Sequence, residues 1–250
     1  MSGHSKWASI KHKKKLVDAK KGKAFTKLSR AIQVAAREGG GDPAGNPALS
    51  LAIQKARDAS MPKDNIERAI AKGTGADSDA QSFEIVVYEG YGPGGVAILV
   101  EALTDNRNRT SSDVRHAFSS FRGSLGEPGS VAWIFEKKGE LVVDATRYSE
   151  DELMPAIDAG AEDLSLDGDV WEIVTAPAEL SAVRGALEAR GVELDSAEVS
   201  MRPTTRTPVE DGQVGSLMRL IDELEEHDDV QAVHANFDVA ADVLERVAAA

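Results

Sequence analysis

The strand-forming part of this chain begins with residues 83–104, FEIVVYEGYGPGGVAILVEALT. Two runs of apolar and β-branched residues flank a turn with four glycines and one proline, and this pattern predicts two strands joined in a hairpin. Gly90, Gly92 and Gly95 also satisfy the dinucleotide-binding spacing GxGxxG. A strand follows them, however, so no helix N-terminus would face a pyrophosphate. We therefore interpret the glycines as a hairpin turn and predict no cofactor.

Upstream of the hairpin the sequence has helical periodicity. Apolar residues recur every three to four positions in three stretches, and the first of these, residues 23–37, carries Lys and Arg on the opposite face. Asn46 followed by Pro47 is a typical N-cap and first-turn pair for the second helix. Pro62 can open the third. These stretches predict a basic helical domain over residues 1–73.

Downstream of the hairpin, helices and strands alternate. We expect a helix over residues 110–121, with Asn108 or Thr110 as its N-cap, and a strand over residues 131–135. Residues 139–202 then give a strand, a helix, two strands, a helix and a strand. This order, βαββαβ, is the ferredoxin-like pattern of an antiparallel sheet backed by helices.

The predicted fold class is α+β and multidomain. An N-terminal helical bundle is followed by two α/β sandwich domains, at least one of them ferredoxin-like (βαββαβ), and the last is inserted in the middle one. The final helix and strand, within residues 207–238, are too few for a domain, so we expect them to complete the sheet begun in residues 83–136. Residues 139–202 would be the insertion, and residues 239–250 a frayed tail.

Charge is divided unevenly along the chain. Residues 1–72 carry 16 basic and 6 acidic side chains, whereas residues 73–250 carry 13 basic and 36 acidic ones, so the net charge of -13 hides a basic head. This asymmetry is typical of nucleic-acid or anionic-surface contact carried by one part of a chain. A membrane surface is the weaker alternative, because the apolar face of the basic part is narrow. The acidic α/β domains could bind protein partners.

The leader of the chain interleaves cations with an aromatic side chain. Its lysines could displace the counterions of a phosphate backbone, and Trp7 could stack on a base or anchor the arm. The alternative is a solvated tail, or a leader whose Trp7 packs on its own domain.

A second candidate contact is the loop that enters the helix after the hairpin. Arg107 and Arg109 would lie beside the first-turn amides, with Arg115 about two turns further on, where a phosphate or RNA could bind. Equally, the loop could be capped and its arginines paired with acids. The candidate nucleic-acid-binding residues are Lys6, Trp7, Lys11, His12, Lys13, Lys14, Lys15, Lys20, Lys21, Lys23, Lys27, Arg30, Arg107, Arg109 and Arg115.

Nothing in the sequence indicates catalysis or a metal site. The chain has no cysteine, its five histidines lack metal-ligand spacing, and its acids are scattered. We therefore predict no enzyme, no metal and no small-molecule substrate; an enzyme acting on a small anion would need a pocket at the three arginines. The missing cysteines fit a reducing compartment, and neither a membrane span nor a signal peptide is evident, so we expect a cytoplasmic protein.

Several longer motifs occur in order along the chain. They are GHSKW at 3–7, MPKDNIERAI at 61–70, YEGYGPGG at 88–95, LTDNRNRT at 103–110, GSV at 129–131, AGAED at 159–163 and NFD at 236–238. Together they closely resemble the YebC/PmpR family, from Gly3 to about Asp238. The sequence departs mildly at residues 15–17, KLV, where many relatives have small or polar residues.

This resemblance implies a helical N-terminal domain, two α/β domains and no catalytic set. Bacterial members of the family are described as transcriptional regulators that bind DNA. Relatives such as the mitochondrial translational activator of cytochrome oxidase act on ribosomal translation. The leading hypothesis is therefore a non-enzymatic, nucleic-acid-binding regulator of gene expression that acts as a DNA-binding transcriptional regulator. The alternative is a ribosome-associated translation factor that binds ribosomal or transfer RNA.

Overall fold

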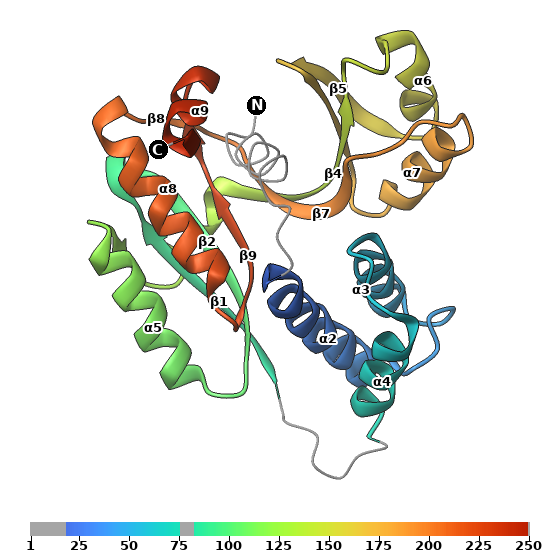
Figure 1. Ribbon diagram of the computed structural model, residues 1–250, viewed down its shortest axis with the longest axis horizontal. Coiled ribbons are helices and arrows are strands. Elements are labelled where there is room, and N and C mark those ends of the chain that lie inside the picture. Colours follow the sequence, from blue (N-terminus) through green and yellow to red (C-terminus); the bar gives the residue numbers. More distant parts are fainter. Residues whose placement is uncertain (1–18, 76–82, 250) are drawn as a thin grey trace.

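The helical part of the molecule contains the three helices that the periodicity predicts. A computed structural model describes residues 19–75 and 83–249 (Figure 1). The helices are α2 (Ala19–Gly39), α3 (Pro47–Asp58) and α4 (Lys63–Gly73). Asn46 caps α3, because its Oδ1 accepts a hydrogen bond from Leu49 N at 3.1 Å. Its side-chain amide donates to Ala35 O at 2.7 Å, so the same residue fixes α3 against α2.

The predicted hairpin is present and forms the centre of the first sheet. β1 (Glu84–Tyr91) pairs antiparallel with β2 (Ala97–Thr104) across the short 3-10 turn η1 (Pro93–Gly95). β9 (Val230–Ala235) pairs with the other edge of β2, and β3 (Ser124–Leu125) pairs with the end of β1. The order is β3-β1-β2-β9, so a strand from near the end of the chain completes the sheet.

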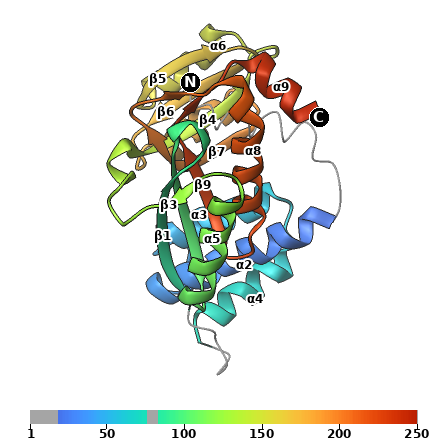
Figure 2. The ribbon, with the colours of Figure 1, turned by 90° about the vertical axis from the view of Figure 1, so that its left-hand side faces the viewer.

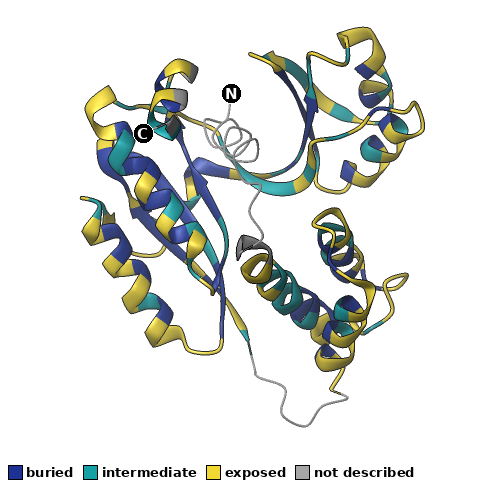
Figure 3. Cartoon of the chain, viewed as in Figure 1, coloured by how far each residue is buried: buried dark blue, intermediate teal, exposed yellow. Residues whose placement is uncertain are grey.

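Two helices cover one face of this sheet. They are α5 (Arg107–Ser120) and α8 (Asp211–Glu226), which lie side by side in Figures 1 and 2. Their buried faces turn toward the strands and their exposed faces turn outward (Figure 3). Phe118 of α5 and Leu220 of α8 are fully buried in one core with Ile98 of β2. Burial of such side chains contributes roughly 1.5–3 kcal/mol each.

The second sheet has the predicted βαββαβ succession. Its elements are β4 (Phe135–Asp144), α6 (Glu150–Asp158), β5 (Ala161–Asp167), β6 (Val170–Thr175), α7 (Leu180–Glu188) and β7 (Ser196–Pro203). The strand order is β5-β6-β4-β7 and every neighbouring pair is antiparallel. Leu141, Leu153 and Ile173 are fully buried between the strands and the helices.

The strand expected over residues 131–135 is largely absent. The chain instead forms a 3-10 turn, η2 (Ala132–Ile134), before β4 begins at Phe135. The reason is the buried carboxylate of Glu89, which accepts hydrogen bonds from Val131 N at 2.7 Å and Ala132 N at 2.8 Å. Those two amides are therefore not free to pair with a strand.

The end of the chain also differs from expectation. Residues 241–249, predicted as part of a frayed tail, form helix α9 (Ala241–Ala249). Val243 and Leu244 are buried in the core of the first sheet, and this burial offsets the entropy of ordering the segment. Two short strands, β8 (Thr207–Pro208) and β10 (Phe237–Asp238), pair in parallel and form a separate two-stranded sheet.

The molecule is thus an α+β protein with antiparallel sheets and three main apolar cores. One core lies among α2, α3 and α4, one under α5 and α8, and one under α6 and α7. These cores support the proposed division into residues 1–73, 83–136 with 207–238, and 139–202, which stays a proposal. Within the described residues no helix is long and apolar enough to cross a membrane.

Candidate nucleic-acid interface

Many of the candidate nucleic-acid-binding residues belong to the leader. Those outside the described residues are Lys6, Trp7, Lys11, His12, Lys13, Lys14 and Lys15. Lys20 and Lys21 lie in α2, but their side chains are not described. The structure therefore bears on six candidates, three from α2 and three from α5.

The three candidates of α2 face the turn between α8 and β9. We call residues 225–229, which end α8 and lead into β9 and which contain four carboxylates and His227, the acidic turn. The distances are 2.6 Å from Lys27 Nζ to Glu225 O, 2.8 Å from Arg30 Nη1 to both Asp228 O and Asp229 Oδ1, and 3.9 Å from Lys23 Nζ to Asp228 Oδ1. Burial lowers the pKa of Lys27, although the neighbouring carboxylates oppose this effect.

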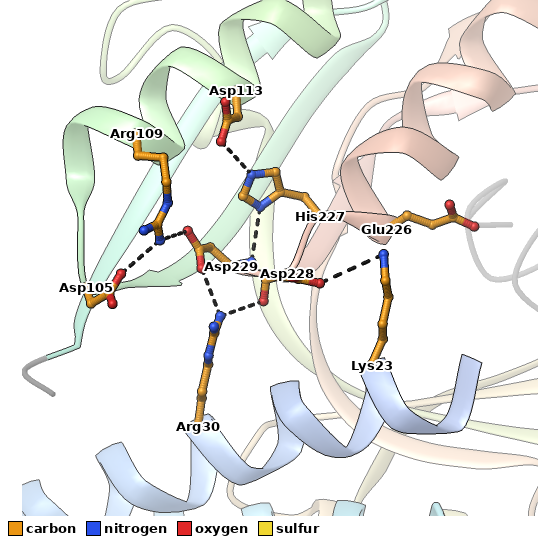
Figure 4. Close-up of a pocket in the computed structure, with 9 residues that line it drawn as sticks. All are labelled: Lys23, Arg30, Asp105, Arg109, Asp113, Glu226, His227, Asp228 and Asp229. Atoms are coloured by element: carbon orange, nitrogen blue, oxygen red, sulfur yellow. Dashed lines mark hydrogen bonds and ion pairs between the residues drawn. The ribbon is translucent and has the colours of Figure 1, made fainter. Parts of the chain in front are cut away.

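Asp229 is the centre of this contact, and its side chain is only 3% exposed. Its Oδ1 accepts from Arg30, and its Oδ2 accepts from Arg109 Nη2 at 2.8 Å (Figure 4). The same Oδ2 accepts from Thr110 Oγ1 at 2.7 Å. Burial alone would raise the pKa of Asp229, but the hydrogen bonds from Arg109 and Thr110 outweigh it and lower the pKa to about 2. The carboxylate is therefore ionised and joins α2, α5 and β9.

The loop before α5 is capped in a different place from the one expected. Asn106, rather than Asn108 or Thr110, is the N-cap, and its Oδ1 accepts from Arg109 N at 3.1 Å. Thr110 cannot take this role, because it lies inside the helix, buried, with its hydroxyl against Asp229. The helix consequently begins at Arg107, three residues before the expected start.

The three arginines of α5 have different surroundings. Arg109 pairs with Asp105 Oδ1 at 2.8 Å as well as with Asp229. For Arg109 the second expectation therefore holds, in which the loop is capped and its arginine is paired with acids. These carboxylates raise the pKa of Arg109 further above its usual range. Arg107 and Arg115 are exposed, and neither lines the cleft beside Asp229.

The cleft beside Asp229 has a volume of about 490 Å³ (Figure 4). Its lining residues are Lys23, Arg30, Asp105, Arg109, Asp113, Glu226, His227, Asp228 and Asp229. Asp229 N donates to His227 Nδ1 at 3.1 Å, and His227 Nε2 lies 3.2 Å from Asp113 Oδ2. Five carboxylates against three cations make this lining a poor site for an anion. Of the three arginines of α5, only Arg109 lines this cleft.

The sequence did not single out three residues that matter in the structure, namely Asp229, Glu89 and Trp133. Asp229 was visible only as the end of the run His227-Asp228-Asp229, and Glu89 only as one residue of the motif YEGYGPGG at 88–95. Trp133 was assigned to a strand, but it lies on the 3-10 turn that Glu89 fixes and is 72% exposed. Its indole Nε1 donates to Ser130 O at 3.1 Å.

The fold and the site together define a class of protein. It is a multidomain α+β protein in which a basic helical part meets two acidic sheet-containing parts through charged side chains. In residues 19–75 and 83–249, no group of three or more His, Asp or Glu side chains is placed to hold a metal ion.

Comparison with known proteins gives the family. Residues 5–76 match the TACO1/YebC N-terminal domain, and residues 83–237 match the TACO1/YebC second and third domain. The chain belongs to the TACO1/YebC family.

Similar proteins match over nearly the whole chain. A "probable transcriptional regulatory protein" of Rubrobacter xylanophilus is 57% identical over 249 residues, which cover 99% of this chain and 100% of that protein. One from Desulfotalea psychrophila is 54% identical over 250 residues, with the same coverage. The crystal structure of the conserved hypothetical protein Aq1575 from Aquifex aeolicus has a TM-score of 0.80 and 47% identity, and the match covers 89% of this chain and 92% of that one.

Proposed function

We propose that this protein is a non-enzymatic regulator of gene expression that binds nucleic acid, most directly as a DNA-binding transcriptional regulator in the cytoplasm. The observation that carries this proposal is the segregation of charge. A head with 16 basic and 6 acidic residues precedes a body with 13 basic and 36 acidic ones. The names of the relatives from Rubrobacter and Desulfotalea support a regulatory role.

The proposed contact is made by the leader together with the exposed cations that follow it. Arg107 and Arg115 are exposed and available to phosphate, whereas Lys23 is paired with Asp228, and Arg30 and Arg109 are paired with Asp229. Contacts between these cations and phosphates are sequence-independent, because every nucleotide presents the same phosphate group. The acidic body would repel a duplex, so it limits the footprint and leaves its surface for protein partners.

Crosslinking in growing cells, followed by sequencing of both the recovered DNA and the recovered RNA, tests the proposal. Enrichment of promoter DNA is the expected result. Recovery of ribosomal or transfer RNA without DNA would replace the transcriptional role with the translational one, since both polymers present the same phosphates. Recovery of neither polymer above an untagged control would contradict nucleic-acid binding altogether.

A further inference from the structure

Helix α2 has two faces with different chemistry. Its apolar face, with Ile32, Ala35 and Ala36, belongs to the core of the helical part. Its cationic face carries Lys23, Lys27 and Arg30 at positions i, i+4 and i+7, one helical turn apart. This cationic face is the one that meets the acidic turn.

The acidic turn presents oxygens to these cations as a phosphate backbone would. Two carboxylates, from Asp228 and Asp229, and two backbone carbonyls, from Glu225 and Asp228, each lie within 3.9 Å of a Lys or Arg nitrogen. Phosphate oxygens are bound by the same side chains with the same charge-assisted hydrogen bonds. A nucleic acid and the acidic turn would therefore occupy the same side of α2.

We propose that the acidic turn is an internal competitor for nucleic acid. It covers the cationic face of α2 in the free protein, and a bound phosphate backbone displaces it and releases the helical part from the first sheet. This inference rests on the proposed function, because it assumes that α2 binds nucleic acid. It goes further by assigning the acidic turn an autoinhibitory role.

The hydrogen bonds around Asp229 make such a displacement feasible. When Arg30 leaves, the buried carboxylate of Asp229 keeps Arg109 and Thr110 as partners, so no unpaired charge is left inside the protein. Arg30 and Lys27 in turn exchange the acidic turn for phosphate oxygens. The acidic turn is thus held on one side by α5 and is free to separate from α2 on the other.

Among the described residues, two further ion pairs join the helical part to the second sheet. Lys55 of α3 pairs with Glu198 at 3.0 Å, and Asp58 pairs with Arg184 of α7 at 3.1 Å. Ion pairs that are partly exposed contribute little and are screened by salt. The core of the helical part is also distinct from the cores under the two sheets. A polyanion would therefore compete with ion pairs rather than with a shared apolar core.

Energy transfer between two dyes tests the displacement. The natural chain contains no cysteine, so dyes would attach only to cysteines that are introduced. The substitutions Ala71→Cys on α4 and Ser112→Cys on α5 introduce one at each of two exposed positions. We expect transfer in the full-length protein to fall when a 25-base-pair DNA duplex, or a structured RNA of similar charge, is added at low salt. Binding of both polymers without any change in transfer would overturn the inference and leave the proposed function intact.

A charge-matched pair of variants provides the second arm. Asp228→Asn removes an exposed carboxylate that faces Lys23, and Glu223→Gln removes one on the outer side of α8. We expect Asp228→Asn to tighten binding about two- to fivefold and to lower transfer without ligand, which is the scale of one surface ion pair. Glu223→Gln should change both the affinity for nucleic acid and the transfer without ligand by much less. Equal effects of the two variants would mean that only net charge matters, and no binding by either would overturn the proposed function as well.

Discussion

Asp229 shows how a charged side chain can be stable in the interior of this protein. Desolvation penalises its carboxylate, but two arginines and Thr110 supply hydrogen bonds to both of its oxygens. A buried charge is tolerated only when such partners are present. The residue therefore holds three elements together, and its removal should be felt in the stability of the whole molecule.

Replacement of Asp229 by Asn should lower the free energy of unfolding. The substitution keeps the size of the side chain but removes the charge that Arg30 and Arg109 bind, so we expect a loss of about 1.5–3 kcal/mol in urea denaturation. Asp228→Asn is the control, because the side chain of Asp228 is 63% exposed. This substitution should lower the free energy of unfolding by less than about 0.5 kcal/mol. Similar losses from the two variants would show that Asp229 is not the central residue.

The same carboxylate predicts a dependence of stability on pH. Its pKa in the folded protein, about 2, lies below the ordinary value of 3.8, so its stabilisation is complete above about pH 5 and is lost as the pH falls toward 2. The difference corresponds to roughly 2 kcal/mol. Urea titrations between pH 5 and pH 2.5 should show a smaller fall for Asp229→Asn than for the wild type, and parallel curves would contradict the pKa shift.

At the scale of helices and strands, periodicity was a good guide wherever local sequence determines the structure. The hairpin of β1 and β2, the cap at Asn46 and the βαββαβ succession all follow from spacing and turn residues. Spacing and turn residues do not predict the start of α5, the turn before β4 or the helix α9. Each of these depends on a distant partner, namely Asp229, Glu89 and the core of the first sheet, which the sequence does not reveal.

The true cap of α5 can be distinguished from the expected one by substitution. Asn106→Ala removes the hydrogen bond to Arg109 N and should cost about 1 kcal/mol of stability. Asn108→Ala, at an exposed position inside the first turn, should be neutral or slightly stabilising, because alanine is the better helix former. Thermal or urea denaturation measures both, and a larger loss at position 108 would contradict the observed cap.

The loop that carries Trp133 should depend on Glu89. The carboxylate accepts from the backbone amides of Gly129, Val131 and Ala132, and these bonds keep the pKa of Glu89 low even though burial would raise it. Glu89→Gln weakens this set, so hydrogen exchange at the three amides should accelerate. Glu84→Gln, at an exposed position on the same strand, should leave their exchange unchanged, and equal exchange in both variants would refute the role of Glu89.

At the scale of the whole molecule, the basic and the acidic stretches of the sequence form different parts of the structure. The basic α2 touches the acidic turn through Arg30, and α3 touches the second sheet through Lys55. The sequence was sufficient to predict the family, because its motifs are local patterns, whereas the basic candidates stay a prediction. It left open whether Arg109 is paired with acids, and it did not predict the partners of Lys27 and Arg30 in the acidic turn, because these lie more than 190 residues away along the chain.

The salt dependence of nucleic-acid binding tests the central claim most directly. The binding constant for a DNA duplex or an RNA should be measured from about 50 to 300 mM salt for the wild type and two triple variants. Lys13, Lys14 and Lys15 are replaced by Ala in one, and the exposed Lys63, Arg68 and Lys72 of α4 in the other. We predict that the leader variant binds more weakly across sequences and that its slope of log K against log salt falls by about one for each phosphate that it no longer neutralises, with a smaller change in the α4 variant. A leader variant with the wild-type slope would contradict the claim that the basic end of this chain binds nucleic acid.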